Sequence, residues 1–210
     1  FAPDSDFDVE NLVEEKGRIR MVLPKTTNYQ IGLVLREGNL LSELNKEVKH
    51  SDFDIVIMGS PHRNRMTNKI SQFLDASIFF VKNFNPNWNY KILLCVDDSR
   101  ATKRAVILST RISKHFDAEI TSLTVSKTSF FGKGYRNAYV WAERYLKRIG
   151  IPFNSKLLSG NPVEVFVNEA GEDHIIIMGK AKGNEIMKFI LGSKPIHTAQ
   201  RANCPVLLVN

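Results

Sequence analysis

Two groups of residues in the second half of the chain have the types and spacing needed to bind phosphate. Asp97-Asp98-Ser99 directly follows one apolar run, and Gly179 ends another, with Gly183 and Gly192-Ser193 further along. Glycine lacks a Cβ atom, so backbone amides at such positions can approach a phosphate closely. The two aspartates could bind Mg²⁺ beside a phosphate, although capping a helix is the commoner use of such residues.

The sequence contains no arrangement that indicates catalysis. Ser193 follows a glycine but lacks the Gly-x-Ser-x-Gly pattern of a nucleophile. The histidines have no spacing to Cys or carboxylates that suits a metal ion; they are His50, His62, His115, His174 and His197. We therefore predict no catalytic residue, no bound metal and no enzymatic activity.

The segment His174–Gly179 is expected to organise the fold. Its three isoleucines do not alternate with polar residues, which predicts a strand covered on both faces in the middle of a parallel sheet. Residues 90–210 contain five strand patterns separated by helical patterns, so we expect a parallel sheet with helices on both faces. Ligands bind such sheets at the carboxyl ends of the strands, where Asp97 and Gly179 lie.

Strands and helices are expected along most of the chain. The predicted strands are 18–23, 29–35, 55–59, 77–82, 90–96, 118–125, 152–158, 174–179 and 205–209. The predicted helices are 40–48, 66–74, 100–115, 135–149, a helix beginning near Pro162, a short piece before Gly192 and 196–202. Residues 1–17 are expected to form an arm, or a short helix over 9–15, and Gly150 is expected to cap the helix before it.

Three segments of the first half parallel segments of the second half in the same order. The pairs are 51–60 with 171–180 at an offset of 120 residues, 35–39 with 157–161 at 122, and 78–81 with 206–209 at 128. This order indicates a duplication, with chance similarity of two buried strands as the alternative. The first copy has no counterpart of residues 90–135, so it needs an inner strand from Arg18–Leu23 or from a partner chain.

Composition limits the class of protein. The chain has 210 residues, 43% of them hydrophobic, and its longest apolar runs are far too short to span a bilayer. Cys95 and Cys204 form no CxxC motif, so we expect reduced, structural thiols in a cytoplasmic protein. Residues 1–90 hold 11 Lys and Arg against 12 Asp and Glu, whereas residues 91–210 hold 18 against 10. The excess of positive charge in residues 91–210 is explained either by solvated helix faces or by a surface that attracts phosphate, anionic lipid or nucleic acid. We predict no nucleic-acid partner, because aromatic and basic residues do not interleave.

The second half resembles the universal stress protein family. The family's strand ending in Val-Asp-Gly-Ser corresponds to Val96-Asp97-Asp98-Ser99, with Asp98 in place of glycine. Its later pattern, Gly-x2-Gly-x9-Gly-Ser/Thr, is matched by Gly179, Gly192 and Ser193, with Lys182 at the middle glycine and Gly183 one residue late. The closing segment 204–209 is also typical of the family. The match is good over 90–210 and weak over 28–82.

The resemblance implies ATP or AMP binding in the second half. The residues implied to bind the nucleotide are Asp97, Ser99, Val125, Met178, Gly179, Lys182, Gly183, Gly192 and Ser193. Asp97 would meet the adenine or ribose, the glycines would admit the triphosphate, and Ser193 would donate at a helix start. The cation of Lys182 would either neutralise phosphate or fill the space that glycine leaves open, so an emptied, structural pocket is the alternative. No nucleotide is expected in the first half.

The expected fold class is α/β, with tandem universal-stress-protein-like, doubly wound parallel sheets of the adenine nucleotide alpha hydrolase-like kind. The expected parts are an arm and short strand at 1–27, a shortened first domain at 28–84, a linker at 85–90 and a complete five-stranded domain at 91–210. The expected function is a non-enzymatic regulatory module that forms a homodimer through the edge strand 205–209. The alternatives are the cytosolic regulatory domain of a membrane transporter with a degenerate pocket, and, more weakly, a nucleotide-using enzyme.

Overall fold

The computed structural model describes residues 12–15, 18–22, 32–34, 36–59, 65–127, 133–180 and 194–210. The chain divides into two compact units, Phe1–Leu44 and Asn45–Asn210, and each is described by itself.

The first unit contains a three-stranded antiparallel sheet. Its strands are β1 (Leu12–Glu15), β2 (Arg18–Val22) and β3 (Gly32–Val34), in the order β1-β2-β3. The prediction of an arm or short helix is wrong for the described residues 12–15, because they form β1, which pairs along its length with β2. A helix of so few residues is marginal in water. The expected strand at 18–23 exists as β2, but it pairs with β1 and β3 and supplies no inner strand to a parallel sheet.

Helix α1 (Leu40–Ser51) begins in the first unit and ends in the second, close to its predicted bounds. The side-chain Oδ1 of Asn39 accepts a hydrogen bond from the Ser42 backbone N at 3.2 Å, as an N-cap residue does. The helix is therefore specified by local signals that the sequence displays.

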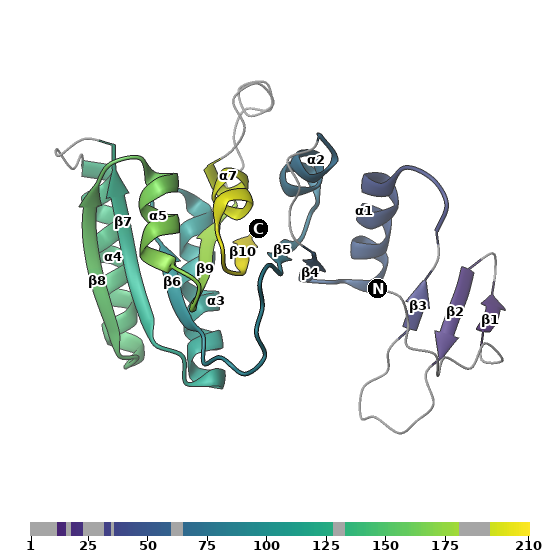
Figure 1. The fold of residues 1–210 in the computed structure, drawn as a ribbon, viewed down its shortest axis with the longest axis horizontal. Coiled ribbons are helices and arrows are strands. Elements are labelled where there is room, and N and C mark those ends of the chain that lie inside the picture. Colours follow the sequence, from purple (N-terminus) through teal and green to yellow (C-terminus); the bar gives the residue numbers. More distant parts are fainter. Residues whose placement is uncertain are drawn as a thin grey trace. The chain divides into compact units, whose positions relative to one another are not determined.

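The second unit is built on one seven-stranded sheet with the order β4-β5-β10-β9-β6-β7-β8 (Figure 1). The strands are β4 (Ile55–Met58), β5 (Ser77–Phe80), β6 (Lys91–Cys95), β7 (Ile120–Ser126), β8 (Phe153–Ser159), β9 (His174–Gly179) and β10 (Val206–Val209). Every neighbouring pair is parallel except β5 and β10, which are antiparallel. The predicted α/β fold class is confirmed, as a single, mostly parallel sheet.

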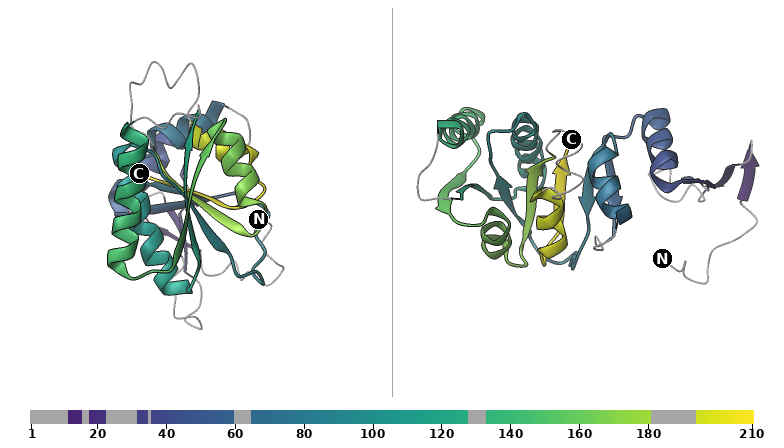
Figure 2. Two further views of the ribbon diagram at one scale, coloured as in Figure 1. Left: turned by 90° about the vertical axis from the view of Figure 1, so that its left-hand side faces the viewer. Right: turned by 90° about the horizontal axis from the view of Figure 1, so that it is seen from above.

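Helices cover both faces of this sheet, as the left view of Figure 2 shows. The helices are α2 (Arg65–Phe73), α3 (Arg100–Phe116), α4 (Lys133–Ile149), α5 (Pro162–Ala170) and α7 (Lys194–Arg201). Helices α3 and α4 pack side by side on one face, and α5 and α7 pack together on the other. Gly150 ends α4 with a φ of +73°, the left-handed conformation expected of a C-terminal glycine.

Strand β9 lies at the centre of the sheet, as its sequence predicts. It is flanked by β6 on one side and β10 on the other, and Ile176 and Ile177 are 0% exposed. Burial of each of these side chains contributes about 1.5–3 kcal/mol. This strand holds the carboxyl edge of the sheet in place.

Strand β4 is not the buried inner strand that its apolar run predicts. Among the described residues it pairs with β5 alone, and the side chain of Ile57 is 69% exposed. The cause lies in its neighbours, because no strand of the described residues lies beside β4 in the position that β6 holds beside β9. Of the two similar apolar runs, only the one that forms β9 therefore takes an inner, buried position.

Strand β10 is not an edge strand. Leu207 lies opposite Phe79 of β5, and on the other side it lies opposite Ile177 of β9. The prediction that 205–209 offers a free edge for a homodimer is wrong, because β5 already occupies its backbone hydrogen-bonding groups on that side.

Candidate functional site

The carboxyl ends of the five parallel strands β6 to β10 form one rim, which brings several predicted site residues together. The register places Cys95 opposite Met178 on one side and opposite Leu123 on the other. Asp97, Gly179 and Val125 therefore end neighbouring strands. The predicted site residues Lys182, Gly183, Gly192 and Ser193 lie outside the described residues.

Asp97 and Ser99 build the turn that starts α3. Oδ1 of Asp97 accepts hydrogen bonds from the Ser99 backbone N at 3.0 Å and from Thr102 Oγ1 at 2.5 Å. Ser99 is the N-cap residue, and its Oγ accepts from the Thr102 backbone N at 3.3 Å. The Asp97 side chain is otherwise exposed, and its Oδ2 has no hydrogen-bond partner among the described residues. One carboxylate oxygen of Asp97 is thus structural, and the other faces solvent.

Gly179 allows α3 to pack against the end of β9. A Cβ atom placed on it would lie 2.7 Å from the backbone C of Ala101 and from the backbone N of Thr102. Real Cβ atoms do not approach backbone atoms so closely, so only glycine fits here. The absence of a side chain at 179 is therefore required by helix packing, whether or not a phosphate also uses it.

Asp98, which replaces the family's glycine, lies beside the start of α4. A Cβ atom on Gly134 would approach the Asp98 Oδ2 to 2.6 Å, so the carboxylate sits against the first turn of that helix. A negative charge is stabilising at the positive end of a helix dipole. Asp98 is consequently explained by helix stability, and the described residues contain no group of three His, Cys, Asp or Glu that could hold a metal.

A cavity of about 840 Å³ opens beside this rim. Its lining is polar and basic: Asn68, Lys127, Gly160, Asn161, Pro162, Val163, Lys194, His197, Gln200 and Arg201. Among the described residues, no Asp or Glu belongs to the lining. None of these residues was predicted to belong to a site, and the position of Lys127 at the end of a strand was the signal available for it.

The positive charge in the cavity comes from separate elements. Lys127 follows β7, whereas Lys194 and Arg201 lie at the spacing of one face of α7. Arg201 is also 3.5 Å from the Glu164 carboxylate, which offsets part of its charge. The start of α5 completes the lining, so a positive helix end adds to the field. The arrangement suits an anionic ligand.

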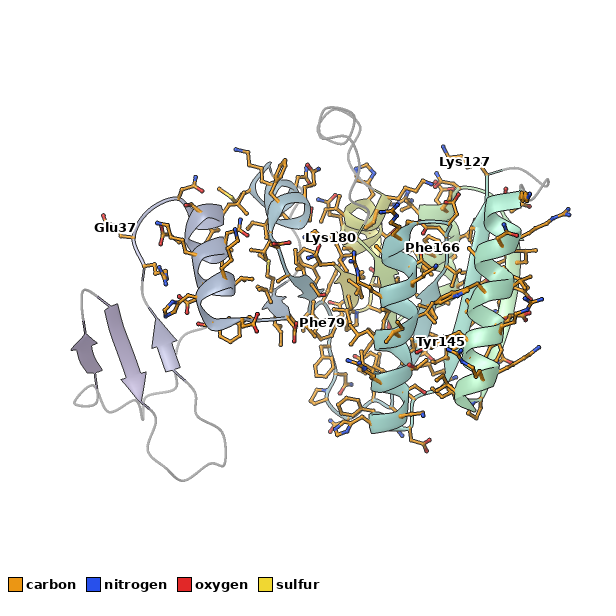
Figure 3. The ribbon with its side chains drawn as sticks, turned by 180° about the vertical axis from the view of Figure 1, so that it is seen from behind. Glu37, Phe79, Lys127, Tyr145, Phe166 and Lys180 are labelled. Atoms are coloured by element: carbon orange, nitrogen blue, oxygen red, sulfur yellow. The ribbon has the colours of Figure 1, made fainter. Side chains whose placement is uncertain are left out.

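Lys180, next to Gly179, is used within the fold. It is only 5% exposed, and its Nζ donates to the backbone carbonyls of Leu74 and Ala76 (Figure 3). These carbonyls follow the end of α2, where a cation is favourable. The contact joins the end of β9 to the α2–β5 connection and directs this cation away from the cavity.

The two thiols lie in the core. Cys95 and Cys204 are free and buried. Burial raises the pKa of the Cys95 thiol well above its usual value and that of Cys204 to about 11. Both are therefore protonated near neutral pH, as expected of structural cysteines.

None of the helices in the described ranges is both long enough and apolar enough to cross a bilayer.

Comparison with known proteins gives one family. The profile described as the universal stress protein family matches residues 89–210. No curated protein matches the chain.

Solved structures share the fold at low sequence identity. A universal stress protein from Archaeoglobus fulgidus DSM 4304 is 18% identical with a TM-score of 0.66, and the match covers 81% of this chain but only 64% of that chain. Another from Archaeoglobus fulgidus is 19% identical with a TM-score of 0.50, covering 58% of this chain and 98% of that chain. An Arabidopsis thaliana family protein with AMP bound is 17% identical with a TM-score of 0.41, covering 57% and 90%. A match over 81% of this chain exceeds the share in 89–210, so the similarity of fold extends into residues 1–88.

Proposed function

Because the chain belongs to the universal stress protein family, we propose that its residues 91–210 bind an adenine nucleotide, ATP or AMP, on the carboxyl rim of the sheet. In this proposal the protein is a non-enzymatic regulatory module, and bound nucleotide changes its affinity for a partner.

The cavity beside the rim is the observation that carries the proposal. Lys127, Lys194 and Arg201 come from two elements yet line one space, and none of the described lining residues is a carboxylate. Charge-assisted hydrogen bonds from Lys and Arg to phosphate are stronger than neutral ones. A cavity of about 840 Å³ is within the size range of small-molecule sites. These features support a site for the phosphates.

Asp97 suits the nucleoside end of the ligand. Its Oδ1 is engaged in the α3 turn, so the carboxylate is held in a fixed orientation. Its Oδ2 accepts no hydrogen bond from the described residues, and it can therefore accept one from an adenine amino group or a ribose hydroxyl. Held in this way, the carboxylate orients the ligand at a strand end, where α/β sheets bind ligands.

Calorimetric titration with ATP and with AMP tests the proposal. Asp97→Asn keeps an acceptor for the α3 turn but removes the charge, and we expect it to weaken binding about tenfold. Lys127→Gln should weaken ATP binding by more than AMP binding, because ATP carries more phosphate charge. Lys156→Gln, at an exposed lysine outside the cavity lining, is the control and should bind like wild type. Equal affinity in wild type and Asp97→Asn would remove Asp97 from the site.

We also propose that β4, α2 and β5 are the end of a shortened first copy of the domain. The support is the register of the strands. Val56 lies opposite Ile78 in the first half, and Ile176 lies opposite Val206 in the second. Val56 corresponds to Ile176 at the offset of 120, and Ile78 corresponds to Val206 at the offset of 128, so equivalent residues are paired in both halves. Phe79 pairs with Leu207, its own equivalent at the offset of 128, as a local twofold relation predicts.

A transporter's cytosolic regulatory domain with a degenerate pocket is the second candidate. The packing at Gly179 favours it, because that glycine is explained without any ligand. Under this candidate, ATP and AMP give no heat of binding to wild type. Long apolar segments in the complete gene upstream of Phe1 would support the membrane link.

A further inference from the structure

The outer surface of α3 and α4 is strongly basic. Each helix presents exposed cations along one stripe, at helix spacings that keep them on the same side. They are Arg100, Lys103, Arg104, Arg111 and Lys114 on α3, and Lys133, Arg136, Arg144, Lys147 and Arg148 on α4. The two helices contain a single acidic residue, Glu143, which accepts a hydrogen bond from the Tyr139 hydroxyl at 3.0 Å. We call these ten cations the basic face.

Helix stability accounts for only part of the basic face: Lys114, Lys147 and Arg148 lie in the last turns, where a cation is favourable, but the other cations do not. None of the ten forms an ion pair with Asp or Glu in the part of the chain that the structure describes. Neither helix has an acidic residue in its first turn, and both carry cations there, at the positive end of the helix dipole. Like charges three or four residues apart also repel each other. The cations in the first turns and the repulsion along each stripe thus carry an electrostatic cost that an anionic partner would relieve.

The aromatic residues between the two stripes are already covered. Trp141 and Tyr145 stack on each other with ring centroids 5.5 Å apart. Lys103 lies 5.5 Å from the Trp141 ring, and Arg148 lies 5.3 Å from the Tyr145 ring. These rings therefore offer no open face on which a nucleic-acid base could stack, which is how aromatic residues bind single strands.

The two helices lie along the surface rather than projecting from it, as Figure 3 shows from behind. Each has 17 residues and so extends about 25 Å. Near the middle of the stripes stand two aliphatic residues, Ile107, which is partly buried, and Val140, which is 39% exposed. A broad surface of this kind has no element that enters a nucleic-acid groove, whereas an anionic bilayer attracts basic residues through charge and requires no matching shape.

We propose that the basic face docks the protein on membrane surfaces that contain anionic lipid. This interaction is separate from the proposed nucleotide site and does not depend on it. It is electrostatic, so it weakens as the ionic strength rises.

Vesicle flotation tests the proposal on the full chain. The vesicles contain phosphatidylcholine alone or phosphatidylcholine with one quarter phosphatidylserine. The face variant carries Arg111→Gln, Lys114→Gln, Arg144→Gln and Lys147→Gln, which lie in the later halves of the helices and outside the proposed nucleotide site. The control variant loses the same number of charges elsewhere, through Lys49→Gln, Lys69→Gln, Lys82→Gln and Lys91→Gln. Thermal melting confirms that both variants fold.

Wild type should bind the phosphatidylserine vesicles and release them at high salt, and it should not bind phosphatidylcholine alone. The face variant, with four charges removed, should bind up to roughly 1000-fold more weakly, and the control variant within about threefold of wild type, because only charges near the lipid contribute. Equal binding by the face and control variants overturns the proposal. The proposal is also overturned if wild type binds duplex DNA more tightly than the vesicles at the same salt and the face variant loses that binding. This result would assign the basic face to nucleic acid.

Discussion

Replacing Gly179 with alanine would test how the carboxyl rim is built. The new Cβ atom would lie 2.7 Å from the Ala101 carbonyl carbon and the Thr102 backbone N, so the start of α3 must move away from β9. Overpacking a core usually costs about 1–3 kcal/mol. Backbone atoms have no alternative rotamer, so we expect a loss near the top of this range, about 3 kcal/mol. For a protein of this size that loss lowers Tm by roughly 6–12 °C.

Scanning calorimetry on Gly179→Ala and a matched control measures this effect. The control is Gly59→Ala, which alters the glycine after β4 that parallels Gly179 in sequence. A Cβ atom at Gly59 meets nothing within 4 Å, so the change in stability should stay within about 0.5 kcal/mol. Equal Tm values for the two variants would refute the packing argument. An unchanged Tm together with lost ATP affinity would instead assign Gly179 to a phosphate contact.

Three further changes have defined outcomes. Lys180→Met leaves two buried carbonyls without their cation and should lower the free energy of unfolding in urea by about 1–3 kcal/mol, whereas Lys156→Met breaks only an exposed pair and should cost under about 1 kcal/mol. Folding raises the pKa of Cys204 from 9.0 to about 11, so the thiol loses its proton at lower pH in the unfolded state than in the folded state. The free energy of unfolding should therefore fall as pH rises from 9 to 11. Urea titrations should show a shallower fall for Cys204→Ala. The apolar edge at β4 should give concentration-dependent self-association in sedimentation velocity, and Ile57→Lys should abolish it; association unaltered by the substitution would place the contact elsewhere.

The strands show how far the sequence determines the fold. Ile55–Met58 and Ile175–Met178 have almost the same composition, and both form strands, so apolar runs predict the element type correctly. They do not predict burial, because burial depends on which strands lie alongside. Strand β9 has neighbours on both sides, whereas β4 pairs with β5 alone in the described part of the chain. The sequence likewise does not reveal that β5 seals the edge of β10, because that pairing joins segments about 130 residues apart.

The candidate site, like the strands, was predictable from the sequence only in part. The positions of Asp97 and Gly179 follow from the rule that parallel strands end at one edge, and the registers confirm that they are close. The cavity could not be predicted, because its lining combines the start of α5, one face of α7 and Asn68 of α2. The contact of Lys180 with the carbonyl of Leu74 spans 106 residues and is equally invisible to local patterns.

Mapping the ATP site by amide chemical shifts in isotopically labelled protein tests the central claim most directly. We predict that ATP shifts the amides of Asp97, Lys127, Asn161 and Gly179, which lie along the carboxyl rim and the adjoining cavity. Amides at the opposite edge, such as that of Lys91, should stay unchanged. Shifts confined to that opposite edge, or no shifts at saturating ATP, would contradict the account.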